Sequence, residues 1–213
     1  MTGLALYLVG ADARCSDGAC GQVSRVVIDP ATLTVTHLVV ESDDPHQLGR
    51  LVPIDLLDTA PGEISLHCTA TEFFQLPRAE NTQSPPRTGK PEPALFRLGG
   101  KSGRRIVGPL GFAVKTPGPR TFTYDVLPAG KVALRGDDPA DALDGAIGHI
   151  TGVVADAGSG QVAYLLLHAG HLLGKNIAVP ISAVTRLDAG IQLGMTKHDV
   201  KHLPPVDLQQ PGG

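Results

Sequence analysis

Two histidines have the spacing of a metal-binding helix. His198 and His202 lie four positions apart, so a helix would carry both on one face, as a zinc site requires. Asp199 occupies the place where such a motif needs a glutamate as general base, and only a short helix fits before Pro204. A helix capped by Thr196 accounts for the same residues. We therefore expect no metal here, and a metal-dependent enzyme is the weakest of three functional hypotheses.

A second histidine pair lies in a predicted loop. His168 and His171 flank Ala169-Gly170 between two expected strands. Histidine changes charge near neutral pH, so this pair suits a ligand or a pH-sensitive contact, although a solvated loop pair is the simpler account. We take both residues as candidate partner-binding residues.

Basic residues cluster in the middle of the chain. Lys101, Arg104 and Arg105 precede an apolar stretch, residues 106–114. A basic cluster beside apolar residues can contact nucleic acid, anionic lipid or an acidic partner. It can also lie across the acidic parts of its own chain, and the sequence leaves these alternatives open. These three residues are further candidate partner-binding residues.

Phosphate-binding and catalytic patterns fail when their spacing is checked. Gly100-Lys101-Ser102 resembles the end of a P-loop, but Leu95 lies where the first glycine is needed. Gly158-Ser159-Gly160 precedes a strand, whereas a dinucleotide fingerprint opens a helix. No Ser/His/Asp or Cys/His arrangement has local support. We predict no enzyme activity, no catalytic residue, no cofactor and no metal.

The chain contains an internal repeat. Residues 17–57 match residues 144–184 without a gap at an offset of 127 positions. A fixed offset indicates two copies of one supersecondary unit. Each copy has short alternating segments rich in β-branched residues, turns every 8–12 residues and one Thr-capped helical turn, a pattern typical of a small β-barrel. The expected strands are 4–9, 21–29, 33–41, 50–54 and 63–68, then 131–135, 149–155, 161–167, 176–180 and 191–195.

The repeat also predicts the core. Apolar residues recur at matched positions of the two copies, and these should be buried. They are Val26, Val27, Val35, Leu38, Ile54 and Leu66 in the first copy, and Val153, Val154, Val162, Leu165, Ile181 and Leu193 in the second.

Each copy resembles the PRC-barrel domain. The resemblance rests on an Asp-Gly opening, a further glycine, a hairpin with an Asp-led turn and a strand ending in Pro-Ile. These are Asp17-Gly18, Gly21, Asp29 and Pro53-Ile54, repeated as Asp144-Gly145, Gly148, Asp156 and Pro180-Ile181. Residues 170–175 are similar to bacterial proteins of this kind. The resemblance covers about 17–77 and 131–204, and it implies docking or scaffold roles with no catalytic residue.

The expected fold is all-β: two small PRC-type β-barrels, each ending in a short helical turn, joined by a Pro/Gly-rich basic linker. The first copy takes residues 1–77, the connector 78–120, the second copy 121–205 and a flexible tail 206–213. The chain has a net charge of −3, yet the connector carries nine Lys/Arg and two acids. Two acidic modules therefore flank a basic connector.

Composition indicates a cytoplasmic protein. No apolar run reaches the ~18–20 residues of a membrane span, and no basic residue precedes the short apolar N-terminal stretch. Cys15, Cys20 and Cys68 are too few for a disulfide framework, so we expect free thiols at small apolar positions, with a Cys15–Cys20 disulfide as the alternative.

These observations favour a non-catalytic protein-binding or scaffold module of the PRC-barrel type. The second hypothesis is an RNA- or ribosome-associated factor that contacts phosphates through the basic connector. A protein partner is expected, RNA is an alternative partner, and a homodimer is left open.

Overall fold

The computed structural model describes residues 3–42, 48–58, 64–83, 105–107, 113–115, 122–169, 175–187 and 190–205. The chain divides into two compact units. The larger comprises residues 1–80 and 126–213, and the smaller comprises residues 81–125. In the smaller unit, β9 (Arg105–Val107) pairs with β10 (Ala113–Lys115). A second two-stranded sheet joins β11 (Phe122–Asp125) to β8 (Glu80–Gln83).

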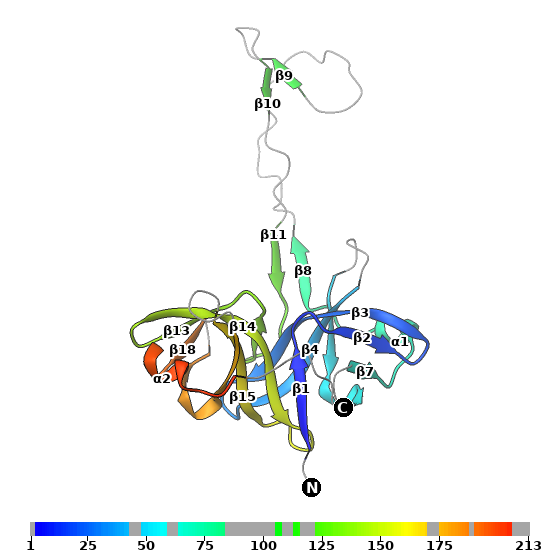
Figure 1. Cartoon of the computed structure of the whole chain (residues 1–213). Helices are drawn as coiled ribbons and strands as arrows, with labels where there is room; N and C mark the ends of the chain where they lie inside the picture. The colour runs from blue at the N-terminus through cyan, green and yellow to red at the C-terminus, as the bar shows by residue number, and fades with distance from the viewer. Residues whose placement is uncertain are drawn as a thin grey trace. The chain divides into compact units, whose positions relative to one another are not determined.

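The larger unit consists of two seven-stranded sheets, each of which curls round on itself (Figure 1). The first has the order β5-β4-β3-β2-β7-β6 with β12 added to β3, and the second has β16-β15-β14-β13-β18-β17 with β1 added to β14. The all-β prediction is confirmed. Closure of each sheet into a PRC-type barrel stays a prediction.

The elements of the two halves follow one order. The first half contains β1 (Leu4–Leu8), β2 (Asp12–Cys15), β3 (Gly18–Asp29), β4 (Thr34–Glu41), β5 (Arg50–Pro53), a 3-10 turn (Ile54–Leu56), β6 (Leu57–Asp58), β7 (Ile64–Leu66) and α1 (Ala70–Phe73). The second contains β12 (Val132–Arg135), β13 (Pro139–Ala142), β14 (Gly145–Asp156), β15 (Val162–Ala169), β16 (Lys175–Pro180), a 3-10 turn (Ile181–Ala183), β17 (Val184–Arg186), β18 (Ile191–Leu193) and α2 (Lys197–Lys201).

The pairing registers repeat along with the residues. In the β3–β4 ladder the register shifts between Val23 and Arg25, and in the β14–β15 ladder it shifts between Ile150 and Gly152, 127 positions later. The β2–β3 and β13–β14 ladders also share one shift. Bulges re-aim the side chains that follow them. The repeat therefore encodes the strand geometry as well as the order of elements.

In each half, two strands approach so closely that only glycine fits at one position. A Cβ on Gly21 would lie 2.0 Å from the carbonyl oxygen of Glu41, and one on Gly148 would lie 1.9 Å from that of His168. No side chain fits at such distances. The repeated glycine of the sequence motif is thus required by backbone contact.

The first strand of each half pairs with the other half. β1 lies antiparallel to β14, with Tyr7 opposite Val153, and β12 lies antiparallel to β3, with Leu134 opposite Val26. Positions 7 and 134, like 26 and 153, differ by the repeat offset, so the exchange is reciprocal and in one register. The sequence analysis placed each of these strands with its own copy, whereas the structure joins each to the sheet of the other. The domain boundaries stay predictions.

Matched caps begin the two short helices. Thr69 and Glu72 form a capping box at α1, and Thr196 and Asp199 form one at α2, as the sequence predicted for the Thr-led turns. A second carboxylate joins each helix to a strand turn of its own half. In the first half, Asp17 in the turn between β2 and β3 accepts the Ala70 N–H through Oδ1 at 2.8 Å. Asp144 does the same for α2. These bonds satisfy N–H groups that have no partner within the helix.

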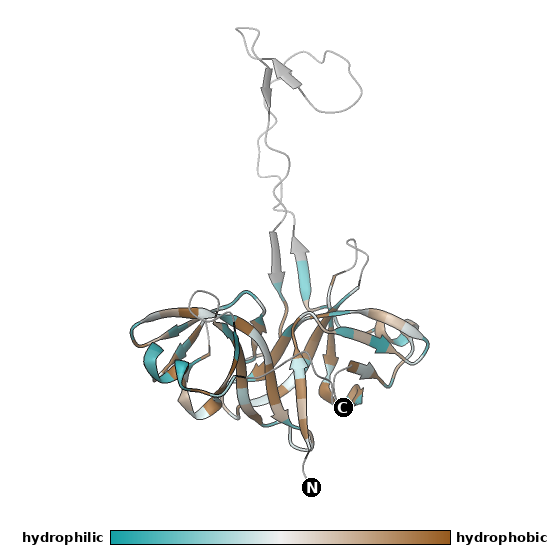
Figure 2. Ribbon diagram, in the orientation of Figure 1, coloured by the Kyte–Doolittle hydropathy of each residue, from teal (hydrophilic) through white to brown (hydrophobic). Residues whose placement is uncertain are grey.

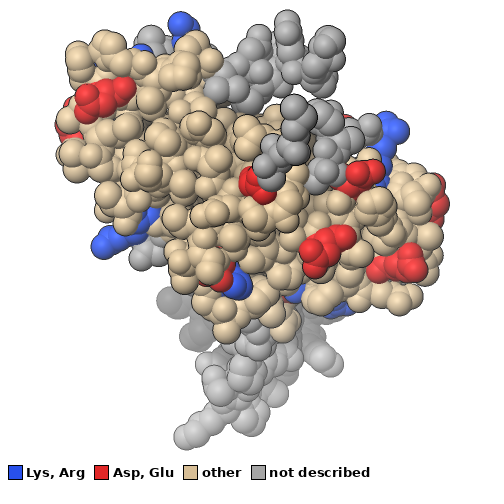
Figure 3. Space-filling view, turned by 90° about the horizontal axis from the view of Figure 1, so that it is seen from below, with Lys and Arg blue, Asp and Glu red and all other residues tan. Residues whose placement is uncertain are grey.

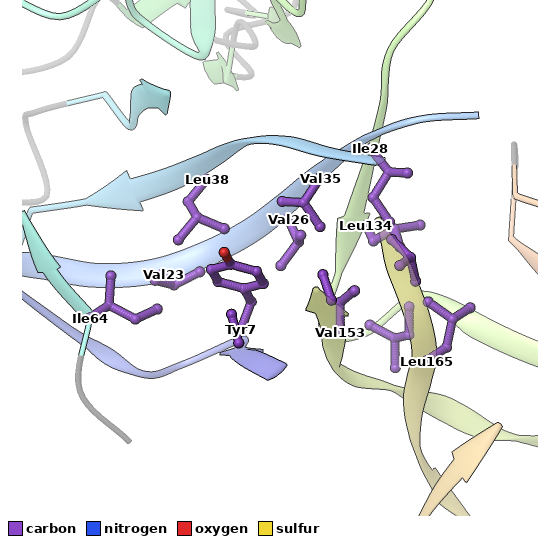
Figure 4. Packing of buried hydrophobic residues seen from close by; sticks show 14 of the residues in the cluster. Tyr7, Val23, Val26, Ile28, Val35, Leu38, Ile64, Leu134, Val153 and Leu165 are labelled. Carbon is purple, nitrogen blue, oxygen red and sulfur yellow. The ribbon is translucent and has the colours of Figure 1, made fainter. Parts of the chain in front are cut away.

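One hydrophobic cluster takes residues from both halves. Figure 2 shows hydrophobic residues along the strands of the larger unit, and Figure 4 shows part of their packing. The predicted core residues are buried except for Ile54, Val154 and Ile181, which are half-buried. Strands exchanged between the halves contribute Tyr7 and Leu134 to this cluster.

Truncation of a core leucine tests the packing. Leu38 and Leu165 are fully buried at repeat-matched positions, so Leu38→Ala and Leu165→Ala should each lower the free energy of unfolding by about 2–5 kcal/mol, through lost transfer energy and the cavity. Urea denaturation measures the change. Leu143→Ala is the control, because Leu143 is 70% exposed. Wild-type midpoints in both core variants would contradict the assignment.

Tyr7 places a hydroxyl in an apolar setting. The Tyr7 ring lies near Val26 and Leu38 in Figure 4, and Tyr7 is 3% exposed. The hydroxyl has no hydrogen-bond partner within the described part of the chain, and burial raises its pKa. An unpaired buried hydroxyl is destabilising.

Removing this hydroxyl should therefore stabilise the protein. We expect Tyr7→Phe to raise the free energy of unfolding by about 1 kcal/mol, since the ring packing is kept and the cost of desolvating the hydroxyl is removed. Chemical denaturation gives the value. A lower stability for the variant would show that the hydroxyl has a partner in solution.

Candidate functional site

An apolar row crosses the second sheet on its outer face, the side away from the main core. Leu6 lies opposite Val154, Val154 opposite Tyr164, and Tyr164 opposite Pro180. Directly paired residues on neighbouring strands point to the same side of a sheet. Tyr164 is 40% exposed, and the other three are half-buried. We call these four residues the apolar row.

A second apolar line runs beside it. Leu8, Gly152, Leu166 and Ala178 are likewise paired in sequence across β1, β14, β15 and β16. At the open end of β1, Leu4 is 63% exposed. The outer face of the second sheet is therefore apolar over several neighbouring strands, with Leu166, 1% exposed, and Gly152 buried within it.

The equivalent row of the first sheet is covered at one residue, Val27, while its other members, Ala133, His37 and Pro53, are half-buried. Val27 is the repeat counterpart of Val154, yet it is fully buried. It belongs to a small separate cluster with Ala79, against which Leu127 and Ala133 pack. Identical valines at matched positions thus differ in exposure because the chain covers one fully and the other only in part.

A buried arginine lies on this same outer face of the first sheet. Arg25 is 6% exposed and takes the position that Gly152 has in the second half. It forms ion pairs with Glu41, at 3.2 Å, and with Glu80 at the start of β8. A buried guanidinium needs such partners because desolvation is costly. Sequence reasoning missed this cluster; an arginine within an apolar strand was the available signal.

His168 lies on a strand rather than in the loop expected from the sequence. It is the penultimate residue of β15, opposite His149, with ring centroids 5.3 Å apart. Its Nδ1 is 3.1 Å from Oδ1 of Asn176 on β16. His171, its expected companion, lies outside the described residues. His149 and Asn176 were not foreseen as its neighbours because pairing across strands sets them.

The basic candidates fall in the connector. Lys101 and Arg104 lie outside the described residues, and Arg105 begins β9, where it pairs in register with Lys115 of β10. Their role stays a prediction.

The histidines of α2 are neighbours. The rings of His198 and His202 are 4.4 Å apart, and Nδ1 of His202 donates to the carbonyl oxygen of His198 at 2.7 Å. Within the described ranges, no group of three or more His, Cys, Asp or Glu side chains could hold a metal ion. No third ligand therefore joins the pair in the part of the chain that the structure describes.

The three cysteines gather at one end of the first sheet. Cys15, Cys20 and Cys68 are buried free thiols, as expected, and the two other thiols affect the pKa of Cys15. Desolvation by burial raises the pKa of Cys15 to about 12 and that of Cys68 to about 11. These thiols are protonated at neutral pH, and sequence reasoning did not predict that they meet.

The larger unit defines an all-β protein with an apolar outer sheet face. None of the helices described is long and apolar enough to cross a membrane. No protein-family model matches the chain, and no curated protein matches its sequence.

Acid should destabilise the fold through its capping and turn carboxylates. The Lys131 ammonium, 2.5 Å from Asp29, lowers the pKa of that carboxyl, with help from the Ala31 N–H. Hydrogen bonds from Thr69 lower the pKa of Glu72. A folded-state pKa below the unfolded value of about 4 stabilises the protein above that pH, and this stabilisation is lost as pH falls through the folded pKa.

We therefore expect the midpoint of urea denaturation to hold near neutral pH and to fall steeply below about pH 4. Asp29→Asn and Lys131→Met should each reduce this pH dependence by a similar amount, because each removes the same pair between β3 and the start of β12. An unchanged pH profile in both variants would contradict a role for the pair.

Proposed function

We propose that this chain is a non-catalytic protein-binding or scaffold module of the PRC-barrel type. The observation that carries the proposal is the apolar row of the second sheet: Tyr164 is exposed and Val154 is half-buried, whereas Val27, the counterpart of Val154 in the first sheet, is fully buried. The repeated Asp-Gly, Gly and Pro-Ile motifs support the PRC-type assignment. Function is expected to reside in surfaces rather than in a reaction centre.

The residues that cover Val27 in the first half indicate what kind of partner would suit the apolar row of the second sheet. In the first half, Ala79 and Leu127 of the same chain pack over Val27. A partner that presents aliphatic side chains would cover Val154 and Tyr164 in the same way. Burial of each large apolar side chain is worth roughly 1.5–3 kcal/mol, so a few such contacts suffice for a transient complex.

The charge pattern on one face of the molecule favours a protein partner over nucleic acid. The face shown in Figure 3 is mostly uncharged, with acidic and basic side chains scattered across it. A nucleic-acid surface instead concentrates Lys and Arg. The basic connector keeps RNA binding as the alternative function, through Lys101, Arg104 and Arg105.

Site-specific crosslinking tests the proposal. A photo-crosslinking phenylalanine derivative at position 164 should form a discrete protein adduct in source cells, because that side chain is exposed in the apolar row. The adduct should disappear when Leu6→Asp or Val154→Asp is added. Position 143, exposed and apolar on the β13–β14 turn, is the matched control and should give no such adduct.

Salt and nuclease separate the alternatives. An apolar contact should survive nuclease treatment and high salt, whereas phosphate contacts weaken steeply as salt is raised. Adducts that are equal at positions 143 and 164, or that vanish with nuclease, would contradict the proposed docking surface. Zinc at one equivalent per chain, lost on replacing His198 and His202, would instead support the metal-enzyme alternative.

A further inference from the structure

The chain returns to the second sheet after α2, just as it returns to the first sheet after α1. Pro205 forms an isolated antiparallel bridge with Ile177 of β16, and Arg78 forms the same bridge with Arg50 of β5. Pro205 and Arg78 differ by the repeat offset of 127 positions, as do Ile177 and Arg50. The repeat therefore holds as far as the last described residue, and Pro205 lies beside the edge strand of the sheet that carries the apolar row.

In the first half, the residue after the bridge packs on the outer face of the sheet. The N–H of Ala79 donates to the Gly49 carbonyl oxygen at 2.8 Å, and Ala79 is fully buried. Ala79 belongs to one cluster with Val27 of β3, Val39 of β4 and Leu51 of β5. The step from position 78 to position 79 thus takes the chain from the edge of the sheet into contact with its face.

The second half has a matching set of apolar residues. Each member of the first cluster has an apolar counterpart 127 positions later, and these counterparts are Val154, Leu166, Ala178 and, in the place of Ala79, Val206. The first half combines Leu51 with Ala79, whereas the second combines Ala178 with Val206, so the larger side chain changes sides. Packed clusters tolerate exchanges that conserve their total volume. Val206 therefore suits the place that Ala79 fills.

The residue after Val206 suits the same face by its charge. In the first half, Arg25 forms ion pairs with Glu80, which follows Ala79, and with Glu41. The counterparts of Arg25, Glu80 and Glu41 are Gly152, Asp207 and His168. Loss of the arginine alone would leave two carboxylates facing each other without a cation. A histidine, which can carry a positive charge near neutral pH, replaces one of the two acids.

We propose that the segment beginning at Val206 docks on the outer face of the second sheet, with Val206 against Val154 and Leu166 and with Asp207 beside His168. Positions 206 and 207 lie outside the described residues. The bridge at Pro205 and the matched contacts of the first half assign them to this face. The segment then covers part of the surface that we assign to a protein partner, so segment and partner compete for it. The competition rests on the proposed function, whereas the docking does not.

Thiol labelling of the purified protein tests the docking. In Val206→Cys, the thiol at position 206 should react with iodoacetamide at least roughly tenfold more slowly than the thiol of Gly212→Cys, because a docked side chain must leave its apolar contacts before it reacts. Peptide mass spectrometry reads each site separately, and the three native cysteines are buried. The further change Val154→Asp should raise the rate at position 206 to that at position 212.

Two more variants control this experiment. Leu143→Asp changes an exposed apolar residue outside the apolar row and should leave position 206 slow. His168→Glu restores the acid of the first half without its arginine, and it should speed labelling at position 206 because two carboxylates then face each other. Equal rates at positions 206 and 212 with Val154 and His168 intact would overturn the proposal. So would a slow rate at position 206 that neither Val154→Asp nor His168→Glu alters.

Crosslinking at position 164 separates this inference from the proposed function. A chain that ends at Pro205 should give several-fold more of the protein adduct, because the competing segment is gone. An equal yield from the two chains would overturn the competition. Slow labelling at position 206 together with no adduct from either chain would overturn the proposed function and support the docked segment.

Discussion

Reciprocal strand exchange is the interaction on which the larger unit depends. β1 completes the ladder on β14, and β12 completes the ladder on β3, in registers that the repeat makes equivalent. Each long strand would otherwise present an edge of unpaired N–H and C=O groups. Because the exchanged strands also add Tyr7 and Leu134 to the core, the two halves share one hydrophobic cluster.

Within this shared fold, the two halves differ mainly in the side chains that point away from the core. Val27 is fully buried while Val154 is half-buried, and Arg25 forms a buried ion-pair cluster where Gly152 allows two backbones to approach closely. Such differences lower the stability of the shared fold only a little, because the hydrogen-bond ladders between strands do not depend on side chains that point away from the core. The repeat thus maintains the fold, while its asymmetry gives the two halves different surfaces.

Much of the fold could be predicted, but little of the candidate site. Alternating apolar residues located most strands of the larger unit but missed the short strands β2, β6, β13 and β17. The Thr-led capping boxes located both helices, because these signals act over a few residues. His168 was placed in a loop because the end of β15 was drawn too early, and the apolar row was not seen because its members come from β1, β14, β15 and β16. Strand-end boundaries and cross-strand neighbours depend on pairing, which local patterns do not specify.

The sequence by itself determined that two copies of one β-rich unit exist, where most of their strands and both helix caps lie, and most of the apolar residues that enter a core. Only the tertiary structure decided that β1 joins the second sheet, that Ala79 packs over Val27, and that three thiols meet. The physical reason is that the repeat makes β3 and β14 nearly equivalent partners, so the pattern of β1 suits either one. The choice between them depends on contacts between residues more than a hundred positions apart.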